Sequence, residues 1–352
     1  MADKDDKDDK AKKPEPIELT ASYDAPGILY GLCHDSKAKT LYGAGADWAV
    51  YRVDLKSKEP KVEKAWSNHE NYVSSLVWQD GVIISAGYDR RLIWTTAADG
   101  KTAQTVEDAH NAWIRDLVLF PDGSRVISCG DDMVVRVRDA ADGKLVNSLE
   151  GHAKKTPQGF ATALYSVAVS PDSKTIASAD RIGDICLWSV ETGELLRRLK
   201  APEFYTYDSV KRSRSIGGIR RVRFSPDGTQ LAVSGIGAVP NVDGFVGPAR
   251  IEVWDWQSGK RLFASEEKHK AVLNDIAFHP SKPILFAAGG GDSGGLLGAW
   301  DSRTGKLLHK AKPKGHIQRL QLDSTGETLY ASGHGGLQVW KLGDLKPAPK
   351  KS

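Results

Sequence analysis

Apolar and polar positions follow a pattern that returns about every forty residues along this chain. Each copy has a short apolar strand, a turn resembling Pro-Asp-Gly, a strand rich in Ser and Ala, and a strand that ends in Trp or a substitute. The turn is clearest at 120–123, 170–173 and 225–228. Several short strands in a repeat of this length are typical of a β-propeller blade. The pattern therefore predicts an all-β fold with four-stranded blades.

Seven copies of the pattern can be counted. The residues that end the third strand lie 40 to 66 residues apart and are Val53, Trp94, Arg138, Trp188, Trp254, Trp300 and Trp340. Asp-Gly and Ser/Thr-Gly pairs, such as 142–143 and 304–305, stand between the third and fourth strands. These pairs supply the positive φ angles that tight hairpins need. We predict a single seven-bladed β-propeller, with blades numbered 1 to 7 along the chain.

The last blade lacks an outer strand, because no strand pattern follows Trp340. Residues 17–21 alternate apolar and polar side chains, and we expect this N-terminal strand to complete the last blade. Closure of this kind removes the unpaired edges of an open array. The expected domains are an Asp/Lys-rich disordered tail (1–16), the propeller (17–342) and a basic disordered tail (343–352).

Composition adds few constraints. The 352 residues are 40% hydrophobic and 27% charged, and the net charge of +4 does not by itself indicate nucleic-acid binding. The three cysteines lie in apolar strand patterns without metal-ligand spacing, which predicts buried free thiols in a reducing compartment. The sequence has no apolar run of 18 residues and no apolar core of a secretory signal at its start. We expect a monomeric cytoplasmic protein without cofactor or metal.

His, Ser and Asp recur at fixed places in the blades, and together they are the ingredients of a catalytic triad. An active site is needed once, whereas this set returns, so we predict a structural network in which His donates to Asp and accepts from Ser. The fullest sets are His69, Ser85, Asp89 and Trp94 in blade 2; His110, Ser128 and Asp132 in blade 3, where Arg138 replaces Trp; and His152, Ser178, Asp184 and Trp188 in blade 4. Partial sets are His269, Asp292 and Trp300 in blade 6, and His316, Ser332 and Trp340 in blade 7.

These motifs give the chain a resemblance to the WD-repeat (WD40) β-propeller family over about residues 17–342. The resemblance rests on segments 150–152 (Glu-Gly-His), 315–316 (Gly-His), 225–228 (Ser-Pro-Asp-Gly), and 254–255 and 300–301 (both Trp-Asp). It implies that the His–Ser–Asp–Trp network is structural and that the propeller is a platform for protein partners. Blade 1 departs from the pattern by lacking both His and Trp, and blade 5 lacks the His. The Thr-Gly-Lys turns resemble those of bacterial members.

Function is sought where the repeats differ from one another. Extra residues occur at 153–163, 201–218, 235–249 and 289–298 in blades 4 to 6. Loops before the inner strand and between the second and third strands emerge on one face, because strand direction alternates within a blade. Binding residues often lie on such loops. The alternative is neutral insertion, since lengthening a loop costs little free energy.

Arginine and aromatic residues in and near these loops are typical anchors of protein interfaces. The loop candidates are Lys154, Lys155, Phe160, Phe204, Tyr205, Tyr207, Lys211, Arg212, Arg214, Arg221 and Phe245. At the mouth of the channel we expect Tyr72, Trp113, Arg115, Tyr165, Arg220, Asn274 and Gln318, flanked by Tyr88 and Asp131. Arginine forks match carboxylate and phosphate groups, so an acidic or phosphorylated protein segment is the expected ligand.

The sequence thus predicts a non-catalytic protein-interaction scaffold that uses the face over blades 4 to 6. One alternative is a nucleic-acid surface at 200–221, where basic residues alternate with aromatic ones. Against it, the excess charge is modest and no recognition motif accompanies it. A hydrolase or lactonase at the channel mouth is a further alternative. Such a site needs convergent carboxylates, metal-spaced histidines or a unique nucleophile with its base, and the sequence shows none of these.

Overall fold

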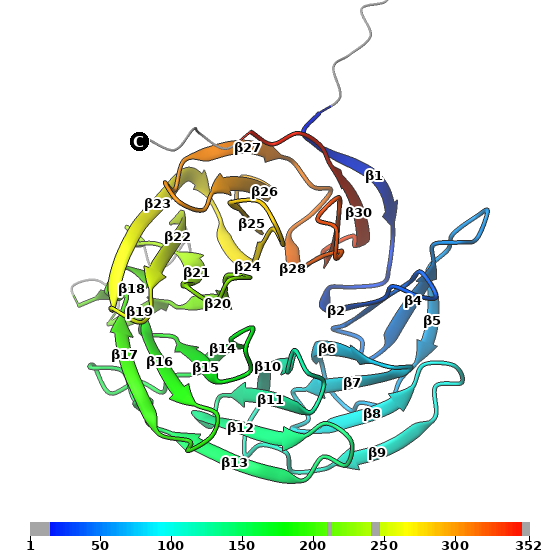
Figure 1. Cartoon of the computed structure of the whole chain (residues 1–352), viewed down its shortest axis with the longest axis horizontal. Coiled ribbons are helices and arrows are strands. Elements are labelled where there is room, and N and C mark those ends of the chain that lie inside the picture. The colour runs from blue at the N-terminus through cyan, green and yellow to red at the C-terminus, as the bar shows by residue number, and fades with distance from the viewer. Residues whose placement is uncertain (1–14, 210–212, 241–246, 347–352) are drawn as a thin grey trace, which may run out of the picture.

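The computed structural model describes residues 15–209, 213–240 and 247–346. Seven four-stranded antiparallel sheets are arranged around a central channel, as Figure 1 shows. In blades 1 to 6 the strands follow one another in chain order from the channel to the outer edge, and in blade 7 the outermost strand is β1. The predicted fold class, a seven-bladed β-propeller, is confirmed.

The strand bounds follow the predicted repeat. Blade 1 contains β2 (Leu29–Asp35), β3 (Thr40–Gly45), β4 (Val50–Asp54) and β5 (Glu63–Trp66), and blade 2 contains β6 (Val73–Gln79), β7 (Val82–Gly87), β8 (Leu92–Thr96) and β9 (Thr102–Val106). Blade 3 contains β10 (Ile114–Leu119), β11 (Arg125–Gly130), β12 (Val134–Asp139) and β13 (Leu145–Glu150), and blade 4 contains β14 (Leu164–Val169), β15 (Thr175–Asp180), β16 (Asp184–Ser189) and β17 (Leu195–Lys200). Blade 5 contains β20 (Ile219–Phe224), β21 (Gln230–Ile236), β22 (Pro248–Asp255) and β23 (Lys260–Lys270), and blade 6 contains β24 (Val272–Phe278), β25 (Ile284–Gly291), β26 (Gly294–Asp301) and β27 (Leu307–Ala311). Blade 7 contains β28 (Ile317–Leu322), β29 (Thr328–Gly333), β30 (Gly336–Leu342) and β1 (Ile17–Tyr23).

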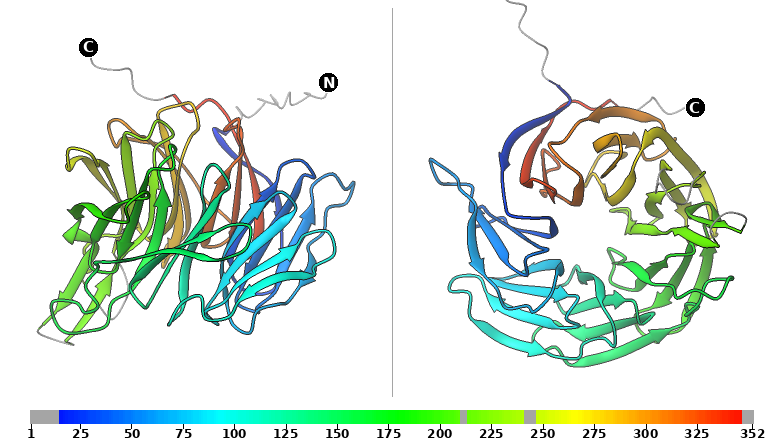
Figure 2. Two further views of the ribbon diagram at one scale, coloured as in Figure 1. Left: turned by 60° about the horizontal axis from the view of Figure 1, so that its bottom comes forward. Right: turned by 180° about the vertical axis from the view of Figure 1, so that it is seen from behind.

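The N-terminal strand closes the ring. Strand β1 pairs with β30 along its whole length, from Ile17 opposite Leu342 to Tyr23 opposite Leu337, and both views of Figure 2 place the two strands side by side. Ile17 is 3% exposed and packs in the core of blade 7. Leu345 joins the same core at 5% exposure, so the packed region extends past the expected boundary at residue 342.

The apolar cores lie between neighbouring blades, because both faces of most sheets are covered. Strand β15, for example, is buried at all six positions. The three cysteines are buried free thiols, as expected. Burial raises the pKa of Cys186 to about 12, which makes its thiol unreactive near neutral pH. Among residues 15–209, 213–240 and 247–346, no helix is long and apolar enough to cross a membrane.

Two of the expected loops are instead ordered β structure. Segment 201–218 forms the short helix η1 (Pro202–Phe204) and a hairpin of β18 (Tyr205–Asp208) and β19 (Arg214–Gly217). The glycine-rich segment 289–298 extends β25 and β26, so only the turn at Asp292 and Ser293 remains between them. Here the expectation of a loop was wrong, because Gly289, Gly290 and Gly291 pair with residues 294–296 and continue the hairpin. Most of segment 235–249 falls between β21 and β22, where residues 241–246 lie outside the described residues.

Blades 2, 3 and 4 each contain a buried Ser–His–Asp network. In blade 2, His69 lies 2.8 Å from Asp89 and 2.7 Å from Ser85. The corresponding histidine–serine distances are 2.8 Å in blades 3 and 4. The three serines are at most 2% exposed. A nucleophile must be reachable by its substrate, and these hydroxyls are not, so the geometry favours the structural role over a hydrolase.

The prediction that Asp184 is the network carboxylate of blade 4 is wrong. His152 lies 2.8 Å from Asp180, two residues before the turn position at which Asp89 and Asp132 occur in the other blades. Asp184 starts the next strand and forms an ion pair with Arg198 at 3.2 Å. Asp180 takes the place of the turn carboxylate, because the side chain of this last residue of β15 reaches the histidine.

One of the tryptophans is one residue out of register. In blade 4, Trp188 donates to the network serine Ser178 at 2.9 Å. Strand pairing shows that the residue of blade 2 equivalent to Trp188 is Thr95, not Trp94. Successive side chains in a strand point to opposite faces. Trp94 therefore lies on the other face of its sheet and donates to the carbonyl of Ala140 at 2.7 Å.

The partial set expected in blade 7 does not form. Strand pairing shows that Ala331 occupies the position that the network serine Ser178 has in blade 4. Ser332 is the next residue and corresponds to Ala179. Ser332 thus points away from the network and has no hydrogen-bond partner among the described residues. His316 instead packs against His334, with ring centroids 4.8 Å apart, and lines the channel mouth. Trp340 is buried in the blade core, and its indole N–H has no hydrogen-bond partner among the described residues.

The partial set expected in blade 6 is also wrong. His269 lies in the outer strand of blade 5, 3.4 Å from the carbonyl of Gly294. Asp292 sits in the turn between β25 and β26 and lines the channel mouth. Trp300 is 1% exposed and packs in the core between blades 5 and 6. The three residues therefore belong to different environments.

We predict that His110 makes stability depend on pH. Burial lowers the pKa of His110 below its ordinary value of 6.5, although Asp132 acts in the opposite direction. The unfolded chain then binds a proton more readily, so stability is lost as the pH falls below about 6.5. His110→Gln should reduce the slope of the unfolding free energy against pH between 7 and 5, by at most about 1.4 kcal/mol per pH unit.

The control is His309→Gln, which changes a histidine beside Glu15 at the surface. Urea unfolding at several pH values measures the slopes. If His110→Gln and His309→Gln have the same slope, the buried network does not carry the effect.

Candidate functional site

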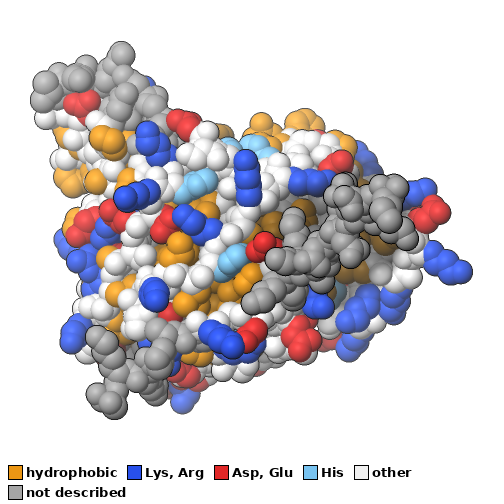
Figure 3. All heavy atoms as spheres, turned by 90° about the horizontal axis from the view of Figure 1, so that it is seen from above, with side chains coloured by type: hydrophobic (Ala, Val, Ile, Leu, Met, Phe, Trp, Pro, Cys, Tyr) orange, Lys and Arg blue, Asp and Glu red, His pale blue; other side chains and the backbone are white. Residues whose placement is uncertain are grey.

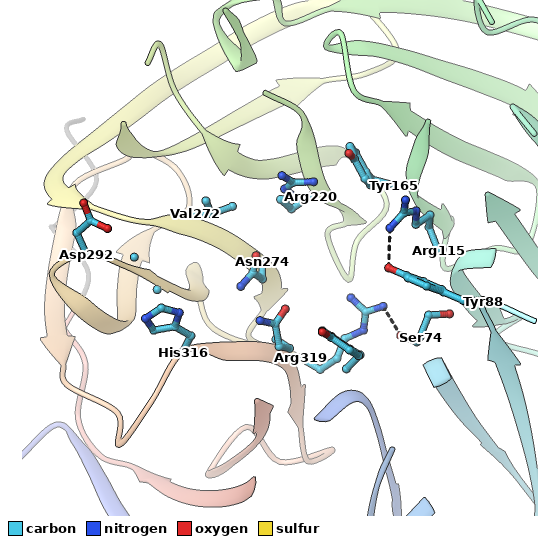
Figure 4. Close-up of a pocket in the computed structure, with 14 residues that line it drawn as sticks. Ser74, Tyr88, Arg115, Tyr165, Arg220, Val272, Asn274, Asp292, His316 and Arg319 are labelled. Carbon is cyan, nitrogen blue, oxygen red and sulfur yellow. Dashed lines mark hydrogen bonds between the residues drawn. The ribbon is translucent and has the colours of Figure 1, made fainter. Parts of the chain in front are cut away.

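A cavity of about 690 Å³ opens at one mouth of the channel, and one residue from each inner strand contributes to it. Each inner strand has a β-bulge near its start, which leaves one residue unpaired. Bulges of this kind re-aim a side chain, and here the bulged residues line the cavity. They are Tyr30, Ser74, Arg115, Tyr165, Arg220, Asn274 and Gln318, several of which are labelled in Figure 4.

Five of these seven residues were expected at the mouth, and Tyr30 and Ser74 were missed. Both occupy the second position of an inner strand, so aligning the seven repeats on that position would have found them. His316 and Asp292 also line the cavity, although they were expected in the buried networks. Arg319, which no sequence pattern indicated, completes the polar side of the wall.

Aromatic rings form a row beside the cavity, from blade 1 to blade 3. Tyr72 lies between Tyr30 and Tyr88, with ring centroids 6.0 and 5.6 Å away. Tyr88 stacks on Trp113 at 4.7 Å with an interplanar angle of 6°. Trp113 is 47% exposed and Tyr72 is 39% exposed. These four residues, which we call the aromatic row, present apolar surface that nothing in the described structure covers.

Arg115 fixes the aromatic row at the cavity edge. Its guanidinium donates to both carboxylate oxygens of Asp131, at 2.6 and 2.7 Å, and to the hydroxyl of Tyr88 at 2.5 Å. It also lies over the rings of Tyr88 and Trp113, 4.9 and 5.2 Å from their centroids. Burial lowers the pKa of Arg115, but Asp131 outweighs it and the net shift is upward. Arg115 thus joins Tyr88 and Trp113 to Asp131 at the cavity edge.

Positive charge prevails next to this cluster. Arg220 lies over the ring of Tyr165 at 4.5 Å, and Arg115 lies 5.6 Å from the same ring. Burial alone would raise the pKa of Tyr165, yet the two guanidinium groups lower it below its ordinary value. Arg115 and Arg220 thus place two positive charges beside the Tyr165 ring.

Exposed large side chains separate by type over the surface. The aromatic ones belong to loops on the face of the channel mouth and are Trp48, Tyr72, Trp113 and Phe160. The aliphatic ones belong to outer strands and are Leu145, Val146, Leu195, Leu196 and Leu262. Trp48 adopts a φ of 69°, a conformation that is strained for a bulky residue. The large exposed rings thus lie on the same face as the cavity.

The basic and aromatic loop expected at 200–221 does not form one surface. Phe204 and Arg221 are fully buried, so neither can be an exposed anchor. Tyr205 donates to Gln158 at 2.7 Å. Lys211, Arg212 and Phe245 lie outside the described residues.

The remaining loop candidates lie beside one another on blades 4 and 5. Tyr207 packs on Phe160 with ring centroids 6.2 Å apart, which joins the blade 4 loop to the hairpin of blade 5. Lys154, Lys155 and Arg214 are exposed. These residues form a smaller exposed group on blades 4 and 5, separate from the aromatic row of blades 1 to 3.

Arg221 is the centre of a buried ion network below the mouth. It lies 2.6 Å from Asp116 and 2.9 Å from Asp275, and all three are at most 1% exposed. Burial lowers the pKa of Arg221, but the two carboxylates raise it by more, so the net shift of the pKa is upward. The residue was expected to bind a partner, and its inward bulge register makes it structural instead. Among the residues that the structure describes, no three His, Cys, Asp or Glu side chains are grouped as metal ligands.

Comparison with known proteins identifies the repeat in blades 2 to 4. Residues 100–139 and 143–189 match the family model "WD domain, G-beta repeat". Each match contains the outer strand of one blade and the three inner strands of the next, β9 to β12 and β13 to β16. The repeat in sequence is thus offset from the blade by one strand, which is why the N-terminal strand must complete blade 7.

The chain is similar to parts of longer proteins. The chain is 25% identical over 201 residues to eukaryotic translation initiation factor 3 subunit I of Candida albicans, which covers 55% of this chain and 49% of the relative. It is 29% identical over 212 residues to the U3 small nucleolar RNA-associated protein 18 homolog of Arabidopsis thaliana, covering 59% and 33%. The matched region is less than half of each relative. Both relatives are eukaryotic, so the comparisons give no support to the bacterial resemblance of the Thr-Gly-Lys turns.

Proposed function

We propose that this chain, a β-propeller that carries WD40 repeats, is a non-catalytic scaffold that binds a protein partner around the channel mouth. The observation that supports it is the aromatic row, which is exposed on one face and fixed by Arg115 and Asp131. Trp, Tyr and Arg are the residues that most often dominate binding energy at protein interfaces. Rigid rings also lose little conformational entropy on binding.

The names of the relatives agree with this proposal. One is named as a subunit of a translation initiation factor, and a subunit contacts other proteins of its assembly. The buried Ser–His–Asp networks offer no accessible nucleophile, which agrees with a protein that is not an enzyme. The reduced thiols of the buried cysteines suit a reducing compartment such as the cytoplasm.

Substitution of the two most exposed rings of the aromatic row should abolish partner binding. We expect Trp113→Ser with Tyr72→Ser to lose proteins that co-purify with the intact chain from its native source, with little change in melting temperature. Truncating a central anchor typically costs at least about 2 kcal/mol of binding energy. Affinity purification followed by mass spectrometry makes the comparison.

The matched control is Leu195→Ser with Leu196→Ser, which removes similar exposed apolar surface (43% and 54%) from the outer strand of blade 4. It should retain the partners. If the control loses them and the aromatic-row variant keeps them, the interface lies on the rim of the ring and the proposal is wrong.

A nucleic-acid ligand is the second candidate, because aromatic rings beside arginines also stack with bases and one relative is named for its RNA association. The outer side of the ring gives it no support. On the side drawn in Figure 3, which shows the ring edge-on, Lys and Arg are interspersed with Asp and Glu. RNA titration belongs in the same experiment, since phosphate contacts weaken steeply between low and physiological salt.

A further inference from the structure

Below the channel-mouth cavity, positive groups outnumber negative ones, and Arg319 is the member of this group that lines the cavity itself. We call floor residues the charged side chains below the bulged ring, which are Asp116, Arg221, Arg223, Asp275 and Arg319. Three guanidinium groups therefore share two carboxylates. Asp116 and Asp275 are each 1% exposed, so both must be paired where they lie.

Arg221 takes the short contacts with both carboxylates. Arg319 approaches Asp116 only at 3.4 Å, and Arg223 approaches Asp275 only at 3.7 Å. Asp116 is further occupied by the Ser166 hydroxyl at 2.9 Å and the Val167 N–H at 3.1 Å. The arginines therefore outnumber the carboxylates by one, and the two that lack short contacts are partly exposed, at 29% for Arg223 and 16% for Arg319. Desolvation and the neighbouring charge of Arg221 lower the pKa of Arg223, in agreement with that excess.

Arg319 presents this excess charge to the cavity. It lines the mouth cavity and also a second cavity below it, so its side chain lies between the two. From blade 7 it reaches across to donate to the carbonyl of Ser74 in blade 2 at 3.1 Å, as Figure 4 shows. The matching position of the intervening blade is Gly31, which has no side chain.

We infer that the partner inserts a carboxylate side chain, from an aspartate or glutamate, into the mouth cavity towards Arg319. The inference rests on the proposed protein-binding function and adds the chemistry of the group that is bound. Arg220 and Arg319 face Asp292 in the wall of this cavity, so the wall carries a net positive charge that one carboxylate would balance. A carboxylate is also the anionic group that an unmodified protein segment supplies. The rest of the segment would then lie along the aromatic row, which borders the same cavity through Tyr30 and Tyr88.

The test uses the full-length chain with sodium acetate as a carboxylate probe. Melting temperature is measured as acetate replaces chloride at constant ionic strength, because a ligand of the folded state stabilises it. The variant is Arg319→Met, and the matched control is Arg198→Met, which removes a surface arginine paired with Asp184 on blade 4. Inorganic phosphate forms a second arm.

We expect acetate to stabilise the wild type and the control equally, and Arg319→Met to bind acetate about tenfold more weakly or worse. Arg319→Met should also keep its melting temperature in chloride, since it leaves two arginines for two carboxylates. Equal acetate responses in all three proteins would overturn the inference. So would a response to phosphate alone, which would indicate a phosphorylated partner, or a large loss of stability in Arg319→Met, which would make the arginine structural.

The proposed function can fail separately. If the aromatic-row variant loses the partner while acetate has no specific effect, the scaffold proposal stands and the carboxylate site is wrong. If acetate binds at Arg319 while that variant keeps all partners, the anion site is real but the partner surface lies elsewhere, so acetate would not be reporting a partner's side chain.

Discussion

Asp116→Asn is expected to lower the free energy of unfolding by about 3–5 kcal/mol, the cost of removing one partner from a buried ion pair. The side chain is 1% exposed and contacts Arg221, Arg319 and two groups of blade 4. Its neutral form would leave three floor arginines with Asp275 alone. Urea unfolding followed by tryptophan fluorescence measures the loss.

The control for this prediction is Asp108→Asn, which removes an exposed carboxylate 3.2 Å from Arg90. Exposed pairs contribute about 0–1 kcal/mol, so this variant should unfold almost like the wild type. Adding Arg221→Met to Asp116→Asn should recover part of the loss, because it removes a charge that has lost its main partner. Equal unfolding of Asp116→Asn and Asp108→Asn would contradict the buried network.

Deletion of residues 1–23 is expected to destabilise the whole ring, since it removes β1 and exposes the outer edge of β30. A single truncation of a buried isoleucine costs about 2–5 kcal/mol, and the deletion loses Ile17 together with the strand pairing. Calorimetry should show a lower melting temperature. Limited proteolysis should show faster cleavage of blades 1 and 7 than of the others.

Deletion of residues 1–13 serves as the control, because it leaves β1 and its pairing with β30 in place. Its melting temperature should equal that of the full chain. If the longer deletion melts at the same temperature as the full chain, closure by β1 does not stabilise the ring, and the last blade must be held by its inner three strands.

The channel-mouth residues could be predicted in part, and the reason lies in the repeat. Five of the seven bulged residues were anticipated because each blade repeats the same geometry and a loop position can be read from it. Tyr30 was missed because blade 1 lacks the His and Trp that mark the repeat. Arg221 was misassigned because it follows Arg220 directly, and neighbouring residues in a strand face opposite environments.

By itself, the sequence determined the seven blades, the closing strand and the buried histidine networks of blades 2 and 3. These features depend on local patterns, namely turn chemistry and alternation, which repeat and so can be checked against one another. Only the tertiary structure decided what lies across the channel: the pairing of Arg221 with Asp116 and Asp275, the reach of Arg319 to Ser74, and the stacking of Tyr88 on Trp113. Most of these contacts join different blades, up to 245 positions apart in sequence. The bulge recurs in every inner strand, but which side chains meet across the channel depends on ring closure, which leaves no periodic signal in the chain.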